Sequence, residues 1–230
     1  MKKPNICGCL LNVSAEDIAR YLRDSGIDLL EWRLDCFIHH RGRRQTMQAL
    51  QALNTPGRHP VVATNRPARE NGLFAGSEEE RIQVLQEAVE SGADWVDLED
   101  DVGADHFAWF KKVDARIVVS HHDFAETPQR RRLQQLVEHM AKKGADIVKV
   151  ATFAKSPQDN LRVLDLIAFG KRELAVDVIA FCMGPVGRWS RLACLLLGSP
   201  WSYAQLPGQA GAASGQLTAA DLRTALELIA

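Results

Sequence analysis

A lysine inside a short apolar run is the sharpest chemical feature of the 230-residue sequence. Lys149 lies in the segment Asp146-Ile-Val-Lys-Val-Ala151, whose apolar residues predict a buried strand. Because side chains alternate along a strand, Lys149 faces the opposite side from Val148 and Val150. Burial disfavours the charged ammonium, and a neutral amine can form a Schiff base with a ketone. The alternative is a lysine that reaches solvent or pairs with an acid.

Two adjacent histidines follow the preceding apolar run. His121 and His122 come after the run at residues 116–120, and Asp123-Phe124 comes next. A histidine can accept or donate a proton near neutral pH. In a barrel this position would lie at the mouth beside Lys149, which suits acid–base catalysis next to a Schiff base. A loop histidine that only makes local hydrogen bonds is the alternative interpretation.

Charged residues gather at the ends of other predicted strands. Glu31, Arg33 and Asp35 alternate along one strand end, where charges that face a core must pair or bind a polar ligand. Further charged residues lie on or just after other strands: Asp97 and Glu99 on the fourth, Arg66 and Glu70 after the third, and Arg191 after the seventh. Arginines around a small pocket suit a substrate with a carboxylate, because a guanidinium binds that group bidentately. A purely structural layer of ion pairs is the alternative.

Eight short apolar runs alternate with amphipathic stretches that carry helix start and stop signals. The runs cover residues 5–11, 28–34, 60–64, 94–98, 116–120, 146–150, 175–181 and 200–204. Ser77 begins a capping box, and Thr127-Pro128 and Ser156-Pro157 each place a capping hydroxyl before a proline. We therefore predict an α/β protein with a (β/α)₈ TIM barrel, with residues 1–230 forming a single catalytic domain. A doubly wound sheet is disfavoured, because polar residues stand at the same end of nearly every strand.

The composition limits the kinds of function that the protein is expected to have. With 46% hydrophobic and 25% charged residues, the chain is average for a soluble globular protein. The formal net charge of −1 predicts no general affinity for nucleic acid or membranes. Five cysteines without a Cys-x-x-Cys pair indicate a reducing, cytoplasmic compartment. The adjacent pairs His39-His40 and His121-His122 lack the spacing of a helical metal site, so we expect neither a metal nor another cofactor.

The order of these motifs resembles the type I 3-dehydroquinate dehydratase family. The resemblance runs from the second strand to the last loop and consists of Glu31-Trp-Arg-Leu-Asp35, Thr64-Asn-Arg66 with Glu70, Asp97-Leu-Glu99, Ser120-His-His-Asp-Phe124, Lys149-Val150, Gly187 to Arg191, and Gly215-Gln216. It implies a hydro-lyase of the shikimate pathway of aromatic amino acid biosynthesis. Such an enzyme dehydrates 3-dehydroquinate to 3-dehydroshikimate through a lysine Schiff base and needs no metal.

The resemblance also implies a role for each residue of the site. Lys149 would condense with the C3 ketone of the substrate. His122 would remove the C2 proton and later protonate the departing C1 hydroxyl, and Glu70 would orient His122. The residues that would bind substrate are Glu31, Arg33, Arg66, Arg191 and Gln216.

Two departures from the family pattern bear on substrate binding. The last loop of the family usually reads Ser-Ala-Pro-Gly-Gln, whereas here Ala212 stands at the first position, and Ser214 is the nearest hydroxyl. The first strand commonly offers a serine near its end, and Gly8 is the counterpart expected here. Each loss removes a hydrogen bond worth about 1 kcal/mol when buried.

Two other functions stay open from the sequence. The first is a barrel lyase, aldolase or isomerase that uses Asp97, Glu99 and a histidine with a metal ion. The second is a non-catalytic paralogue that binds quinate-like acids, which Ala212 and Gly8 motivate. The apolar stretch from Leu217 to Ala230 suits either closure of the barrel or a homodimer contact.

Overall fold

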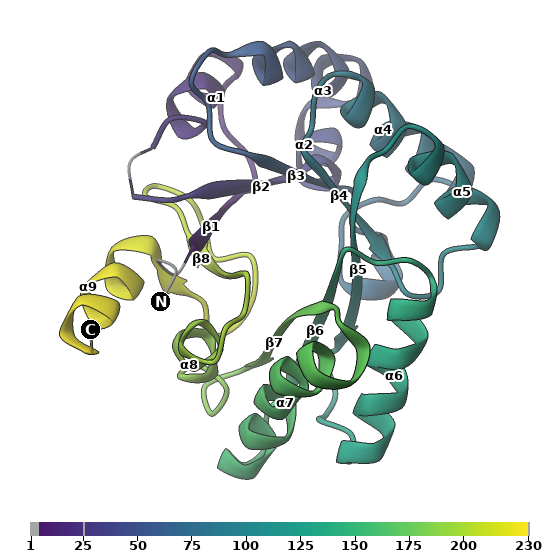
Figure 1. The fold of residues 1–230 in the computed structure, drawn as a ribbon. Helices are drawn as coiled ribbons and strands as arrows, with labels where there is room; N and C mark the ends of the chain where they lie inside the picture. Colours follow the sequence, from purple (N-terminus) through teal and green to yellow (C-terminus); the bar gives the residue numbers. More distant parts are fainter. Residues whose placement is uncertain (1–4, 25, 230) are drawn as a thin grey trace.

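The computed structural model describes residues 5–24 and 26–229 and has a curled sheet of nine parallel strands with helices on its outside (Figure 1). The strands are β1 (Asn5–Leu10), β2 (Leu29–Arg33), β3 (Val61–Thr64), β4 (Trp95–Glu99), β5 (Arg116–Asp123), β6 (Ile147–Phe153), β7 (Asp177–Met183), β8 (Trp201–Gln205) and β9 (Leu217–Thr218). Strands β1 to β8 follow the eight predicted runs closely. The prediction of a (β/α)₈ barrel is confirmed by the fold and by its likeness to solved barrels reported below.

The strands follow one another around the sheet almost in chain order. The order is β7-β6-β5-β4-β3-β2-β1-β8-β9, and within the described residues no hydrogen-bond ladder joins β7 to β8. The carboxyl ends of all eight barrel strands therefore point to one mouth, which is where barrel enzymes carry their sites.

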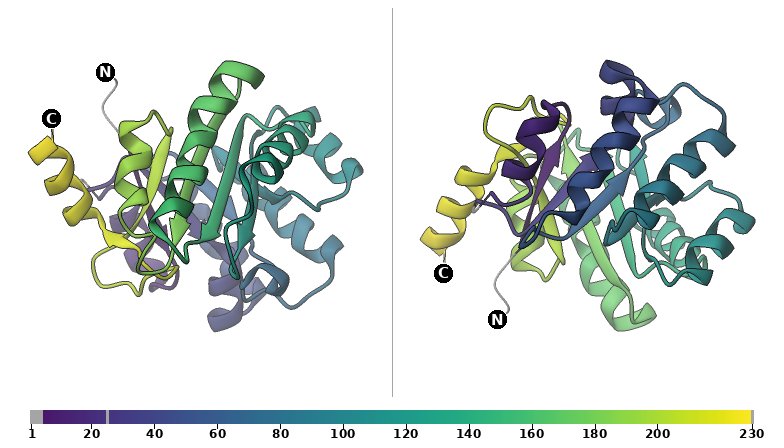
Figure 2. Two further views of the ribbon diagram at one scale, coloured as in Figure 1. Left: turned by 90° about the horizontal axis from the view of Figure 1, so that it is seen from below. Right: turned by 90° about the horizontal axis from the view of Figure 1, so that it is seen from above.

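Each barrel strand is followed by a helix. The α-helices are α1 (Ala15–Tyr21), α2 (Leu34–Arg41), α3 (Arg43–Ala49), α4 (Glu78–Glu90), α5 (Ala104–Lys112), α6 (Arg130–Lys142), α7 (Pro157–Phe169), α8 (Ser190–Leu196) and α9 (Ala219–Ile229). Three short turns are η1 (Leu50–Asn54), η2 (Ala68–Glu70) and η3 (Gly170–Leu174). Figure 2 shows from two opposite sides that the helices surround the strands. Within the described residues, none of the helices has the length and apolar character needed to cross a membrane.

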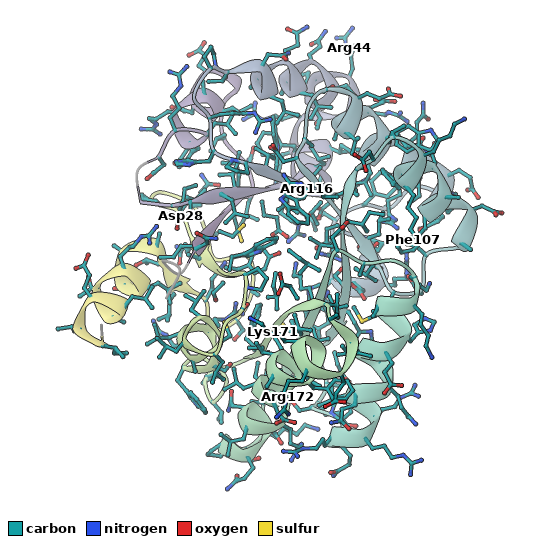
Figure 3. All side chains as sticks on the ribbon, viewed as in Figure 1. Asp28, Arg44, Phe107, Arg116, Lys171 and Arg172 are labelled. Carbon is teal, nitrogen blue, oxygen red and sulfur yellow. The ribbon has the colours of Figure 1, made fainter. Side chains whose placement is uncertain are left out.

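The core lies between the strands and the helices. Phe107 of α5 is buried there, whereas Arg44 of α3 extends outward from the helical layer (Figure 3). On α6 the buried residues Leu133, Val137 and Met140 recur at helical spacing. This amphipathic pattern explains why the helix packs on the barrel with one face only.

The first residues of the helices confirm two of the three capping predictions. Ser77 caps α4 as predicted, because its hydroxyl accepts from Glu80 N at 3.2 Å while Glu80 Oε2 accepts from Ser77 N at 2.9 Å. α7 begins at Pro157, also as predicted. The prediction for Thr127 is wrong, since α6 begins at Arg130. The Thr127 hydroxyl instead bonds with the Thr152 hydroxyl at 2.7 Å and ties the loop after β5 to β6.

Two strands extend further than predicted. β5 continues to Asp123 and β6 to Phe153, so His121 and His122 lie on a strand and Lys149 lies in the middle of one. The ladder between these strands pairs Ser120 with Lys149, so His121 and His122 lie one and two residues nearer the mouth than the lysine. Asp35 was expected on the end of β2, but it lies in the first turn of α2.

Candidate active site

Lys149 lies at the centre of a layer of side chains inside the barrel. Its Nζ is 3.1 Å from Asp97 Oδ2, 3.3 Å from Glu31 Oε1 and 4.2 Å from the ring centroid of Tyr203. These residues come from β6, β4, β2 and β8, so four alternate strands supply one layer, as is usual in this fold. The lysine side chain is only 5% exposed.

The charge state of Lys149 differs from the prediction. Burial is the largest single effect and lowers the pKa of Lys149, but Asp97 and Glu31 together raise that pKa above its usual value. The expectation of a neutral amine is therefore wrong for the resting pocket. The lysine must give up a proton before it can attack a carbonyl carbon.

His122 has an environment that favours the neutral, proton-accepting form of its imidazole. Its Nδ1 lies 2.8 Å from Glu70 Oε2, and its ring stacks on Phe124 with centroids 5.9 Å apart. Burial, together with the positive charges of Arg66 and Lys149, lowers the pKa of His122 well below its usual value. With Nδ1–H donated to Glu70, the free lone pair is on Nε2. A neutral imidazole of this kind can accept a proton.

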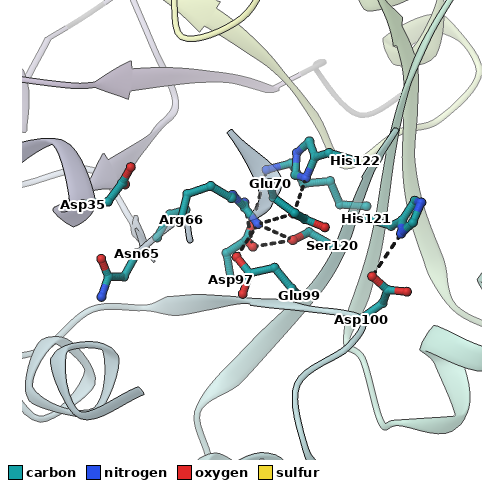
Figure 4. Close-up of polar contacts among 12 residues, drawn as sticks. Asp35, Asn65, Arg66, Glu70, Asp97, Glu99, Asp100, Ser120, His121 and His122 are labelled. Carbon is teal, nitrogen blue, oxygen red and sulfur yellow. Dashed lines mark hydrogen bonds and ion pairs between the residues drawn. The ribbon is translucent and has the colours of Figure 1, made fainter. Parts of the chain in front are cut away.

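Arg66 organises the acids below the histidine (Figure 4). Its guanidinium contacts Asp97 Oδ1 at 2.8 Å, Glu99 Oε1 at 2.6 Å and Glu70 Oε2 at 3.2 Å. It also donates to the Ser120 hydroxyl at 2.8 Å. Although burial raises the pKa of Asp97, Arg66 and Lys149 outweigh it and hold that pKa below its usual range. The Arg66 guanidinium thus makes three ion pairs and one hydrogen bond with protein groups.

The two carboxylates that the metal-dependent alternative would use, Asp97 and Glu99, are already paired with cations in the described part of the chain. Both Asp97 oxygens contact cations, and Glu99 lies 2.6 Å from Arg66 and 2.6 Å from Arg81. Within residues 5–24 and 26–229, the one group with donor atoms close enough to hold a metal is Glu70, Asp100 and His121. Glu70 in that group already contacts His122 and Arg66. The carboxylates near Lys149 therefore serve as ion-pair partners.

Arg33 and Arg191 both line the pocket but differ in their partners. Arg33 donates to both oxygens of Asp35, at 2.8 and 2.7 Å. Arg191 is buried, and no carboxylate of the described chain lies within ion-pair distance of it. Its guanidinium lies 4.4 Å from the Phe181 ring centroid and, among the described residues, donates only to Ser214 O, at 3.4 Å. Burial lowers the pKa of Arg191 to about 10, which indicates a site that an anion would stabilise.

The last loop and the first strand meet at the edge of the pocket. Gln216 Nε2 lies 3.2 Å from Cys9 Sγ, and Gln216 Oε1 accepts from Ala212 N at 2.6 Å. Ala212 lines the pocket, whereas Ser214 is exposed and does not replace the missing hydroxyl.

The expectation for Gly8 is wrong. A side chain at Gly8 would meet Leu206 at 2.5 Å and Ile27 at 3.0 Å, on the side of β1 that faces away from the pocket. The neighbouring Cys9 faces the pocket instead. The sequence contained the signal, because Cys7 and Cys9 share one face of the strand, but it did not say which face is inside.

All eight predicted site residues line one pocket of about 570 Å³, open mouth included. They are Lys149, His122, Glu70, Glu31, Arg33, Arg66, Arg191 and Gln216. Sequence reasoning missed the apolar and neutral part of the lining, which is Cys9, Asn71, Phe124, Ala151, Phe181, Met183, Tyr203 and Ala213. Apart from the exposed Asn71, these residue types are common in any core, so only their position in the fold marks them.

A (β/α)₈ barrel with a buried lysine, a neutral histidine and an unpaired arginine around one pocket is typical of a lyase that acts on a small carboxylate. Residues 6–230 match the family model described as type I 3-dehydroquinase. The chain belongs to the type I 3-dehydroquinase family.

Similar proteins cover nearly the whole chain. A 3-dehydroquinate dehydratase of Syntrophobacter fumaroxidans is 51% identical over 224 residues, which are 97% of this chain and 96% of that protein. The crystal structure of 3-dehydroquinate dehydratase from Geobacillus kaustophilus has a TM-score of 0.89 at 32% identity and covers 99% of this chain and 91% of its own. A type I enzyme from Clostridium difficile, with a TM-score of 0.88 at 24% identity over 100% of this chain and 93% of its own, supports the fold.

Proposed function

We propose that the chain dehydrates 3-dehydroquinate to 3-dehydroshikimate in the shikimate pathway, through a Schiff base on Lys149. Membership of the type I 3-dehydroquinase family supports this activity. The observation that carries the assignment of the lysine is its place at the centre of the pocket, 3.1 Å from Asp97 and 3.3 Å from Glu31. The two acids hold the amine in position and are available to balance the charge of the iminium that forms from it.

The proposed reaction has two halves. In the first, the deprotonated Lys149 amine adds to the C3 carbonyl and water leaves, which forms a protonated iminium. The iminium acidifies the C2 proton, and the neutral His122 removes it. In the second half the C1–O bond breaks, and His122 returns its proton to the departing hydroxyl as water. Hydrolysis of the iminium then releases the product and the amine.

The other site residues are proposed to bind and position. Glu70 holds His122 through Nδ1 and keeps Nε2 free for the substrate. Arg191 binds the substrate carboxylate, because it is the buried cation without an ion-pair partner in the described part of the chain. The ring hydroxyls of the substrate contact Glu31, Arg33, Arg66 and Gln216, or contact side chains that these four residues hold in place.

The setting of the enzyme is also a proposal. We expect residues 1–230 to act as one catalytic domain in the cytoplasm, where the five buried free cysteines stay reduced. Leu228 and Ile229 of α9 are 83% and 55% exposed, which supports a homodimer contact through this helix. Light scattering of the purified protein measures the oligomeric state.

Borohydride trapping tests the proposed chemistry. Reduction in the presence of 3-dehydroquinate should add covalent mass to the peptide that contains Lys149, and Lys149→Ala should lose both the adduct and turnover. His122→Ala should still trap the substrate but should turn it over slowly. Full turnover by Lys149→Ala would refute the Schiff base, and tight binding of the acid without turnover by the wild type would favour the non-catalytic paralogue.

A further inference from the structure

A continuous chain of hydrogen bonds links Lys149 to the last loop. Lys149 Nζ donates to Glu31 Oε1 at 3.3 Å, and Glu31 Oε2 accepts from Cys9 Sγ at 3.6 Å. Cys9 Sγ in turn accepts from Gln216 Nε2 at 3.2 Å, and Gln216 Oε1 accepts from Ala212 N at 2.6 Å. Cys9 therefore links the Gln216 side chain of the loop to Glu31 in the barrel interior.

The Glu31 carboxylate and the Ala212 N–H determine which group donates in each hydrogen bond between them. The ionised Glu31 carboxylate can only accept, so the thiol hydrogen of Cys9 points to it. Ala212 N–H can only donate, so Gln216 must present its oxygen there and its amide N–H groups to the sulfur. Burial and the charge of Glu31 raise the pKa of Cys9 far above its usual value, which keeps the thiol hydrogen in place.

The loop has few other attachments at its pocket end. Ser214 O accepts from Gly184 N at 3.3 Å and from Arg191 at 3.4 Å. No other side chain that the structure describes reaches from the barrel floor to Gln216. The Gln216 side chain thus depends on Cys9 for its position over the pocket.

We propose that Cys9 is a positioning residue that holds Gln216, and with it residues 212–216, in the arrangement that lines the pocket. The kinetic part of this proposal rests on the proposed function, because Gln216 is there assigned to substrate. The thiol acts through Gln216 and not on the reacting atoms. It preorganises the loop before substrate enters, which lowers the cost of ordering the loop on binding.

Kinetics of three variants test this role. Cys9→Ala should raise KM for 3-dehydroquinate about fivefold to tenfold, the loss expected for one hydrogen bond, and should leave kcat within about twofold. Cys9→Ser keeps one donor and one acceptor and should restore KM. Cys7→Ala is the matched control, because Cys7 lies on the same face of β1 and is equally buried but has no bond to Gln216. Its KM should equal that of the wild type.

A double-mutant cycle separates positioning from direct contact. If Cys9 acts through Gln216, Cys9→Ala should have no further effect on KM in the Gln216→Ala background. Effects that multiply would overturn the proposal, because they would mean that Cys9 contacts substrate by itself.

Hydrogen exchange tests the loop without reference to activity. In the substrate-free protein, peptides from residues 206–216 should exchange faster in Cys9→Ala than in the wild type, with Cys9→Ser and Cys7→Ala unchanged. Unchanged exchange in Cys9→Ala would refute the link even in an active enzyme. Conversely, a wild type without dehydratase activity would refute the proposed function, while the exchange result would still decide the role of Cys9.

Discussion

Asp97→Asn is the substitution that best probes the buried charges of the site. Asp97 is fully buried and faces two cations, Arg66 at 2.8 Å and Lys149 at 3.1 Å. Removing one partner of a buried ion pair typically costs about 3–5 kcal/mol of stability. Arg66 keeps Glu99 at 2.6 Å and Lys149 keeps Glu31 at 3.3 Å, which favours the lower end. We expect the free energy of unfolding to fall by about 3 kcal/mol at pH 7, or the melting temperature by about 6–12 °C.

The pH dependence of this loss has a definite sign. The folded pKa of Asp97 lies below its usual value of 3.8, so its contribution to stability is present above that pH and is lost as the pH falls toward the folded pKa. The gap between Asp97→Asn and the wild type should therefore be constant between pH 5 and pH 7 and should narrow below about pH 4.

Urea denaturation at several pH values measures the gap directly. Asp114→Asn is the control, because Asp114 is exposed and has a φ of 56° that asparagine adopts readily. It should change stability by less than about 0.5 kcal/mol. An Asp97→Asn variant as stable as the wild type at pH 7, or a gap that does not narrow in acid, would refute the argument that Asp97 is an ionised partner of both cations.

The remaining predictions concern catalysis and binding. Glu70→Gln should lower kcat on the order of tenfold to 100-fold with little change in KM, because an amide orients His122 less well than a carboxylate; steady-state kinetics that leave kcat unchanged would contradict this. Arg191→Gln should raise KM on the order of tenfold to 100-fold through the loss of a charge-assisted contact, yet should melt no lower than the wild type, because it removes an unpaired buried charge; a large drop in melting temperature would argue for a structural role. The acid limb of kcat/KM should lie below pH 6.5, since the lowered pKa of His122 keeps the imidazole neutral until more acidic pH, and a limb above pH 6.5 would speak against His122 as the base. Dialysis against a chelator should leave kcat unchanged, because Asp97 and Glu99 are engaged by cations, and a loss that a divalent ion restores would revive the metal-dependent alternative.

Most of the fold was predictable because its signals are local. A buried strand needs a short apolar run and a helix needs an apolar stripe with caps, and both patterns can be read within a few residues. The failures came where a residue had a partner far away in the chain. Thr127 precedes a proline as a helix cap would, but its hydroxyl bonds with Thr152 on the next strand.

The site residues were also predictable as a set, because parallel strands deliver their carboxyl ends to one mouth. Their charge states were not. A buried lysine alone should be neutral, and only the approach of Glu31 and Asp97 from β2 and β4 raises the pKa of Lys149 instead.

The sequence by itself determined the order of strands and helices and the family motifs around Lys149. The tertiary structure decided which face of β1 is inside. As a result Cys9 lines the pocket, and Gly8, which the sequence had suggested, faces away from it. It also decided that Arg33 and Arg66 form ion pairs, whereas Arg191 has no ion-pair partner in the described part of the chain. The physical reason is that strand facing and ion pairing depend on through-space distances of a few ångströms between distant segments, and these exist only once the barrel has formed.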